Sequence, residues 1–174
     1  MSSRKPNKSG PYGKKHSGRP RTDRSGQQRI LSPAMDMERA ERLREVLSGL
    51  AEINRLVPVV VEGKKDARAL SSLGFDGKII TLHSGKGMYE FSEELNDNYD
   101  KLVLLLDWDE KGEQLTRTLE QYLKGRWEEF SPLREMIKAI CQKDIKDIEG
   151  IPSLLKRLEG FAGANSIERT GQQG

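Results

Sequence analysis

Short apolar runs alternate with amphipathic segments along the chain from Val57 onward, which is the pattern of an α/β protein. The runs VPVVVE (57–62), KIITL (78–82) and LVLLLDW (102–108) predict three strands. Two of these runs, with the cores VVV and LVLLL, are apolar on both faces, as strands covered on both sides are. The pattern therefore predicts a compact α/β sandwich with a mostly parallel sheet and helices on both faces.

Amphipathic segments between and after these strands predict the helices. Glycines, or the polar turn Asn96-Asp97-Asn98, mark the expected helix ends. The expected helices span residues 64–73, 88–95, 110–124 and 132–142, and a short one closes the domain after a polar connection. The charged segment Trp127–Phe130 is interpreted as a fourth, edge strand, and residues 163–174 as a flexible polar tail.

An amphipathic helix is also expected before the first strand, over residues 34–56. Ser32 and Pro33 are typical of a helix start. Apolar residues then recur at three- and four-residue steps, at Ala40, Leu43, Leu47, Leu50 and Ile53. Gly49 is expected to weaken the helix and to break it there. Such a stripe favours packing against the following domain over dimerisation, and the oligomeric state stays open.

Residues 1–33 have a different composition, with nine Lys or Arg, a single acid, Asp23, and many Gly, Pro and Ser. They contain almost nothing to bury, so a disordered basic tail is expected. Cations of this spacing favour contact with the phosphate backbone of nucleic acid, RNA before DNA. A solubilising extension without a particular partner is the alternative. The candidate nucleic-acid contacts in the tail are Lys14, Lys15, Arg19 and Arg21.

Cysteine content and hydropathy bound the remaining possibilities. The single Cys141 excludes an internal disulfide framework. No apolar run approaches the roughly 20 residues that cross a bilayer, so no membrane association is expected. We therefore expect a cytoplasmic protein with one catalytic or binding domain over residues 57–162.

Carboxylates follow two of the predicted strands at the point where each strand ends. Glu62 follows the first strand, and Asp107 and Asp109 end the third on one side of the extended chain. The carboxyl ends of parallel strands form the ligand edge of an open sheet, so the three carboxylates are expected to converge. Because they would repel one another, a hard cation, Mg²⁺ or Mn²⁺, is expected between them. With one Cys and two His, the chain has nothing that resembles a zinc site.

Two segments resemble the motifs of the toprim domain found in topoisomerases, primases and small nucleases. VVVEGKKDARAL is similar to the strand plus EG-xx-D element, and LVLLLDWDEKGEQL to the strand plus D-x-D-x-x-G element. The resemblance covers about residues 57–150 and is greatest to the small stand-alone archaeal toprim proteins, less to the toprim ribonuclease that matures 5S rRNA. KDIEG, residues 146–150, also resembles the archaeal group. The resemblance implies a Rossmann-like toprim sandwich.

The resemblance also implies roles for individual residues. The glutamate of the EG element corresponds to Glu62, which would act as general acid or base. The D-x-D pair corresponds to Asp107 and Asp109, which would bind Mg²⁺. Gly63 and Gly112 would let the backbone approach a phosphate or the sheet closely, where a Cβ would obstruct it.

Further polar residues near these motifs have open interpretations. Asp66 is either an outer metal ligand or a partner of surface cations. Lys64, Lys65, Lys86 and Lys111 could hold phosphate, although solvated lysine is the default. Lys143, Asp144, Asp147 and Glu149 are interpreted as surface charge. Trp108 is expected to point away from the two aspartates and to pack under a helix.

Three functional classes fit these residues. The preferred hypothesis is Mg²⁺-dependent hydrolysis of phosphodiester bonds, in RNA before DNA. The alternative is a non-catalytic module that binds nucleic acid or associates with the ribosome. A third class, an enzyme acting on a small phosphorylated nucleotide, would leave the basic tail without a role. Topoisomerases of this family use a tyrosine from a separate domain, for which no room is expected here, since Tyr89, Tyr99 and Tyr122 lie in the predicted sandwich or on its helices. The template-handling domains of primases are not expected either.

Overall fold

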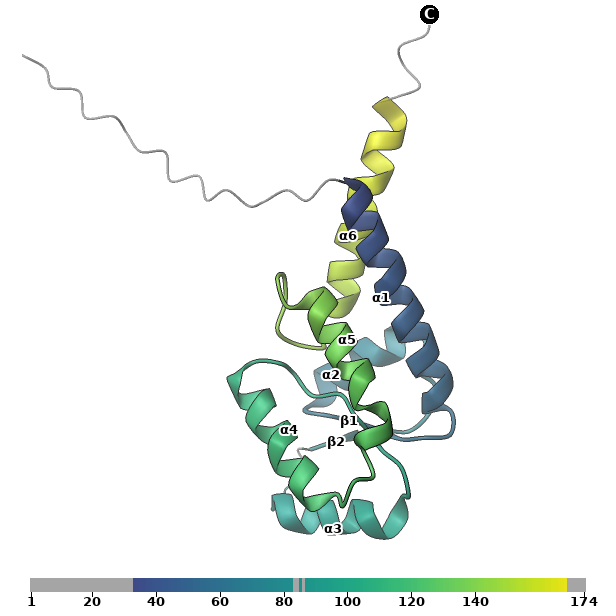
Figure 1. Ribbon diagram of the computed structural model, residues 1–174. Coiled ribbons are helices and arrows are strands. Elements are labelled where there is room, and N and C mark those ends of the chain that lie inside the picture. The colour runs from purple at the N-terminus through teal and green to yellow at the C-terminus, as the bar shows by residue number, and fades with distance from the viewer. Residues whose placement is uncertain (1–32, 83–84, 86, 169–174) are drawn as a thin grey trace, which may run out of the picture. The chain divides into compact units, whose positions relative to one another are not determined.

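The computed structural model describes residues 33–82, 85 and 87–168. These residues form six α-helices, one short 3₁₀-helix and three strands (Figure 1). In chain order the elements are α1 (Pro33–Asn54), β1 (Val59–Val61), α2 (Lys64–Ser72), β2 (Ile79–Thr81), α3 (Met88–Asn98), β3 (Val103–Leu104), α4 (Glu110–Tyr122), η1 (Glu128–Phe130), α5 (Ser131–Cys141) and α6 (Ile151–Glu168).

The three strands form one parallel sheet in the order β2-β1-β3. Val59 is level with Ile79 on one side and with Val103 on the other, so β1 lies in the middle. The predicted α/β fold with a parallel sheet is thereby confirmed, as are the three strand positions. Because all three strands run the same way, Glu62 and Asp107 follow neighbouring strands at the same edge of the sheet.

Apolar side chains leave the sheet in both directions and build two cores. Val59, Val61 and Val103 face a core shared with α1, α2, α5 and α6. Val60 and Leu104 face a second core shared with α3 and α4. This alternation is the period of two of an extended chain, and it explains why VVV and LVLLL carry no polar position.

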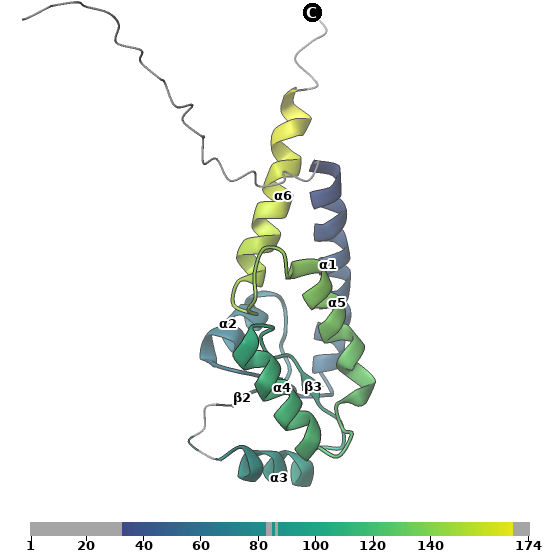
Figure 2. The same ribbon diagram turned by 60° about the vertical axis from the view of Figure 1, so that its left-hand side comes forward.

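Helices α1 and α6 run side by side in both views (Figures 1 and 2). Leu43 and Leu50 of α1 are fully buried with Leu158 of α6 in the larger core. The N-terminal helix therefore packs on the domain that follows it, as the apolar stripe predicts. The expected break at Gly49 is wrong, because α1 continues to Asn54 and the buried leucines on either side outweigh the cost of about 1 kcal/mol for a helical glycine.

Two other predicted elements differ in the structure. Residues 96–98, predicted as a turn, form the last turn of α3, and the buried Asn96 side chain donates a hydrogen bond to the Tyr122 carbonyl at 2.9 Å. Trp127–Phe130, predicted as an edge strand, contains the 3₁₀-helix η1, which leads directly into α5. Both predictions rested on local composition, whereas the end of α3 is held by a hydrogen bond to a segment 26 residues away.

The two ends of the chain differ in what is described. Helix α6 extends to Glu168, so residues 163–168, expected to belong to a flexible polar tail, are helical in the structure. The predicted disordered tail of residues 1–33 lies outside the described residues except for Pro33, which begins α1, and residues 169–174 lie outside them as well. No helix in the described ranges is long and apolar enough to cross a membrane.

Candidate metal and phosphate site

A polar pocket of about 340 Å³ lies at the carboxyl ends of β1 and β3. Every residue of the pocket wall belongs to one of three segments: the β1–α2 junction, the β3–α4 junction, and the connection before α6. The lining residues are Glu62, Gly63, Lys64, Lys65, Asp66, Asp107, Asp109, Asp147 and Glu149. The structure thus brings the predicted carboxylates from two strand ends to one pocket.

Glu62 follows β1 directly, and its side chain is only 14% exposed. Its Oε1 accepts a hydrogen bond from the Nζ of Lys111, which lies in the first turn of α4. This ion pair raises the pKa of the Lys111 ammonium. A cation from the second motif therefore already neutralises the carboxylate of the first.

Asp107 is half-buried at the end of the third apolar run. Its Oδ1 accepts a hydrogen bond from the backbone N–H of Ile148 at 2.9 Å. Burial, together with the neighbouring charges of Asp66, Glu62 and Asp147, raises the pKa of the Asp107 carboxyl to about 7, against the opposing effect of the Ile148 hydrogen bond. Such a shift means that a negative charge on Asp107 is costly unless a cation compensates it.

Asp66 lies one helical turn after Glu62 and is 6% exposed. Its Oδ2 accepts the backbone N–H of Gly63 at 2.9 Å, which closes the N-terminus of α2. Burial raises the pKa of the Asp66 carboxyl, and Glu149, Glu62 and Asp147 add to the effect. Asp66 therefore faces the pocket rather than a solvated helix surface, in favour of the ligand interpretation over the surface pairing.

Asp109 is exposed and caps α4, since its Oδ1 accepts the backbone N–H of Gly112 at 2.7 Å. Gly112 is required for packing, because a Cβ at this position would lie 2.2 Å from the carbonyl oxygen of Asp107. Gly63 is different, because a Cβ there would meet only Asp66 Oδ2, at an ordinary 3.7 Å. The prediction of a close approach is confirmed for Gly112; at Gly63 the described atoms give no obstruction.

The connection 145–150 contributes two further acids to the pocket wall, Asp147 and Glu149. Glu149 is exposed and pairs with Lys65, so its interpretation as surface charge stays a prediction, as does that of Asp147. Trp108 anchors the connection, donating its Nε1–H to the Ile145 carbonyl at 2.8 Å and its backbone N–H to that of Lys146 at 3.0 Å. Trp108 is buried in the larger core, as predicted. The resemblance of KDIEG to the archaeal proteins was the only signal for these two acids in the sequence.

Arg134 of α5 supports the site from behind and was not singled out in the sequence. Arg134 is 4% exposed, and its guanidinium donates to the backbone carbonyls of Leu106, at 3.1 Å, and Asp107, at 2.8 Å. Glu113 of α4 accepts a further hydrogen bond from Arg134 at 2.9 Å. A buried cation thus holds the backbone that carries Asp107.

The predicted phosphate contacts are distributed unevenly. Lys64 and Lys65 are exposed at the pocket wall, and Lys65 also lies 3.4 Å from a carboxylate oxygen of Glu149. Lys111 is paired with Glu62, as described above. Lys86 and the tail residues Lys14, Lys15, Arg19 and Arg21 lie outside the described residues, so their roles stay predictions.

The donor set of the pocket fits a hard divalent cation in its chemistry. All candidate ligands are carboxylates, and the raised pKa of Asp107 reflects its burial together with the charges of neighbouring acids. Within the described residues, however, no three acids, histidines or cysteines are grouped closely enough to hold a metal ion. The assignment of Glu62, Asp107 and Asp109 as Mg²⁺ ligands therefore stays a prediction, and it requires Glu62 to leave Lys111.

The charge of Asp107 has a consequence for stability that depends on pH. Because the pKa is about 7 in the folded chain and about 3.9 in unfolded chains, the folded state holds an extra proton between these values. The free energy of unfolding therefore falls as the pH rises from about 4 through about 7, because the folded state must give up this proton. In EDTA, we expect Asp107→Asn, which keeps the acceptor for Ile148, to raise the melting temperature at pH 8 and to change it little at pH 4.

Melting curves by circular dichroism across this pH range test that expectation. Asp76→Asn, at an exposed acid that pairs with Arg55, is the matched control and should give no pH-dependent gain. Equal gains at pH 4 and pH 8 for Asp107→Asn would contradict a raised pKa at this site.

Comparison with known proteins shows similarity over the region that contains this pocket. The family model described as "Toprim domain" matches residues 57–148. A UPF0292 protein of Methanosarcina barkeri is 34% identical over 124 residues, which cover 70% of this chain and 85% of that protein. A UPF0292 protein of Thermococcus sibiricus is 35% identical, over 73% of this chain and 98% of that protein. A solved structure of a "putative protein from Aquifex aeolicus" is 28% identical, with a TM-score of 0.49 over 60% of this chain and 94% of that one.

Proposed function

The chain belongs to the toprim family, and from this premise we propose that it hydrolyses phosphodiester bonds in RNA in a Mg²⁺-dependent reaction. Membership of the family indicates a metal-dependent function related to nucleic acids. The choice of hydrolysis, and of RNA as substrate, goes beyond that indication. It rests on the residues of the pocket and on the basic composition of residues 1–33.

One observation carries the proposal: acids from three segments line a single pocket at the strand ends, with the Asp107 pKa raised to about 7. Structural acids are usually separated or paired, whereas burial and neighbouring carboxylates raise the pKa of Asp107 and of Asp66 here. The first turns of α2 and α4 also begin at this pocket, and helix N-termini favour phosphate groups. The pocket thus places carboxylates, which suit a cation, beside helix N-termini, which suit an anion.

Each pocket residue has a proposed role that follows from its position. Asp107 and Asp109 would hold Mg²⁺, which when bound would neutralise the charge of the scissile phosphate. Lys111 would pass from Glu62 to a phosphate oxygen when the substrate enters, which leaves Glu62 to accept or donate a proton. Lys64 and Lys65, at the mouth of the pocket, would bind neighbouring phosphates without reading bases.

The test is incubation of the full chain with structured RNA and with DNA, with Mg²⁺ or EDTA, followed by gel analysis of the products. We expect cleavage of RNA with Mg²⁺, and a loss of about 100-fold or more in Asp107→Asn, which retains the fold. Asp76→Asn, remote from the pocket, is the matched control and should cleave as the wild type does. Cleavage that persists in EDTA or in Asp107→Asn would refute Mg²⁺-dependent hydrolysis at this pocket.

A non-catalytic binding module is the second candidate function. It is favoured by the hydrogen bonds that already occupy the acids: Glu62 with Lys111, Asp107 with Ile148, and Asp109 with Gly112. If these contacts persist with RNA present, Glu62 stays paired with Lys111 and cannot act as general acid or base. Metal-independent RNA binding without cleavage, equal in wild type and Asp107→Asn, would establish this module instead.

A further inference from the structure

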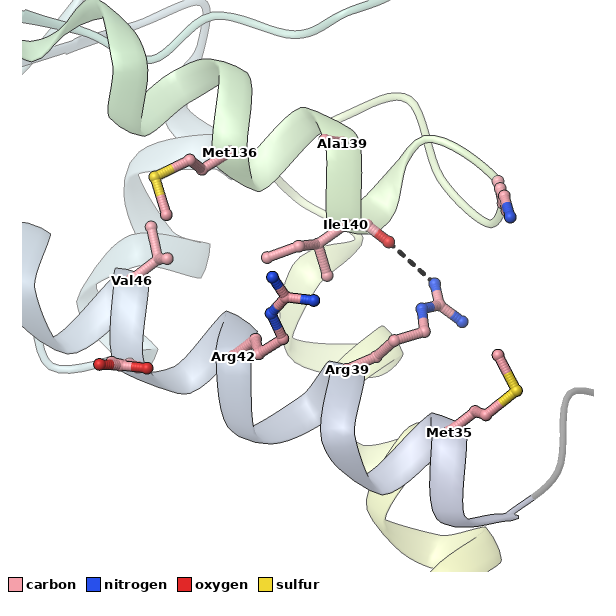
Figure 3. Close-up of a pocket in the computed structure, with 9 residues that line it drawn as sticks. Met35, Arg39, Arg42, Val46, Met136, Ala139 and Ile140 are labelled. Carbon is pink, nitrogen blue, oxygen red and sulfur yellow. Dashed lines mark hydrogen bonds between the residues drawn. The ribbon is translucent and has the colours of Figure 1, made fainter.

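A second pocket lies between α1 and α5 and shares no residue with the carboxylate site (Figure 3). Its volume is about 590 Å³, within the usual range of about 300–1,000 Å³ for binding pockets. Its lining residues, hereafter the α1–α5 groove, are Met35, Arg39, Arg42, Glu45, Val46, Met136, Ala139, Ile140 and Lys143. The toprim chemistry proposed above gives this groove no role.

The floor of the groove is apolar. Met136 and Val46 approach each other from the two helices in Figure 3, and Ile140 extends toward α1. Met136 is 49% exposed, which is high for an apolar residue. Methionine is flexible and polarisable, and it is frequent on surfaces that bind apolar side chains of a partner. The floor is therefore suited to apolar anchors rather than to water.

The rim of the groove is cationic, with three basic residues and one acid, Glu45. Arg39 is fixed in place, because its guanidinium donates to the Ile140 carbonyl at 2.9 Å and to the carboxylate of Asp144 at 2.5 Å. Arg42 is 70% exposed and has only a 4.0 Å ion pair with Glu38, which contributes little to stability. Lys143 makes no ion pair with any described residue. Two cations therefore remain for a ligand.

We propose that the α1–α5 groove docks an acidic amphipathic helix of a partner protein. Helices bind such grooves through apolar residues at i, i+3, i+4 and i+7, and acids beside these anchors would meet Arg42 and Lys143. The chain's own residues 1–32 are excluded by charge, because they carry nine Lys or Arg and one acid. RNA is disfavoured, because an apolar floor gives its phosphates no partners.

The test starts from a displayed library of helical peptides of about 16 residues. The peptides carry leucine at the anchor positions and a random choice of Glu, Gln or Lys elsewhere, and they are selected on the full chain. We expect the selected peptides to be acidic. Fluorescence anisotropy of the best peptide should then show binding that Met136→Glu weakens about tenfold or more, since a central anchor is lost.

Matched variants separate the groove from general surface effects. Met37→Glu makes the same substitution on α1 at an exposed methionine outside the groove, and it should leave binding unchanged. Arg42→Glu should weaken the binding of the acidic peptide, and the effect should be larger at low salt. Ala139→Trp, which fills the groove from an exposed helical position, should abolish binding and serves if Met136→Glu does not fold.

Three results would overturn the proposal. These are selection of neutral or basic peptides, absence of any selected peptide, and binding that neither Met136→Glu nor Ala139→Trp weakens. Sedimentation of the chain alone provides an independent check. A dimer that Ala139→Trp dissociates would show that a second copy, rather than an acidic partner helix, covers the groove.

Discussion

Arg134→Met is expected to lower the free energy of unfolding by about 3 kcal/mol, at the lower end of the range for breaking a buried charge network. The substitution leaves the carbonyls of Leu106 and Asp107 without the donors that they have in the folded chain. Glu113 keeps one partner, because Lys138 also donates to it at 2.9 Å. Urea unfolding at neutral pH, followed by circular dichroism, measures the change.

Two further variants serve as controls for the loss of stability in Arg134→Met. Arg68→Met removes an exposed arginine of α2 and should change stability by no more than about 0.5 kcal/mol. Arg134→Lys keeps the charge but lacks the fork that serves two carbonyls, so an intermediate loss is expected. A change below about 1 kcal/mol in Arg134→Met would contradict a role for Arg134 in holding the β3 end, given that an unsatisfied buried group alone costs about 1–3 kcal/mol.

The sheet could be predicted from the sequence because its signal is local. Three apolar positions in a row, as in Val59–Val61, require cover on both faces, and the structure provides two cores. The helix over Asn96–Asn98 could not be predicted, since the polar residues there are typical of turns. The Asn96 amide instead bonds to the Tyr122 carbonyl, 26 residues away in sequence.

Some residues of the candidate site could likewise be predicted from the sequence, and others could not. Glu62 and Asp107 were predictable, because a strand-end position is visible in the order of apolar and acidic residues. Asp147 and Glu149 were not, because the hydrogen bonds of Trp108 to Ile145 and Lys146 bring their segment to the pocket. Lys111 was interpreted as a solvated lysine or a phosphate contact, yet in the structure it neutralises Glu62. This pairing between two motifs is revealed by neither motif alone.

Gly112→Ala is expected to lower the free energy of unfolding by about 3 kcal/mol, as overpacking at a rigid contact does. A Cβ at this position would lie 2.2 Å from the Asp107 carbonyl oxygen and 2.6 Å from its carbon. Backbone atoms cannot rotate away as a side chain can, so either α4 or the β3 end must shift. The same carbonyl accepts the Arg134 hydrogen bond, so the shift would also disturb the support of Asp107.

Gly49→Ala is the matched control, because a Cβ at Gly49 meets no atom within 4 Å. Both glycines are helical, so helix propensity alone favours alanine at each by about 1 kcal/mol. Opposite signs are therefore expected, with a gain for Gly49→Ala and a loss for Gly112→Ala in urea unfolding. A gain in both variants would mean that the helix N-terminus moves without cost, and that the spacing of the second motif does not fix Asp107 in the pocket.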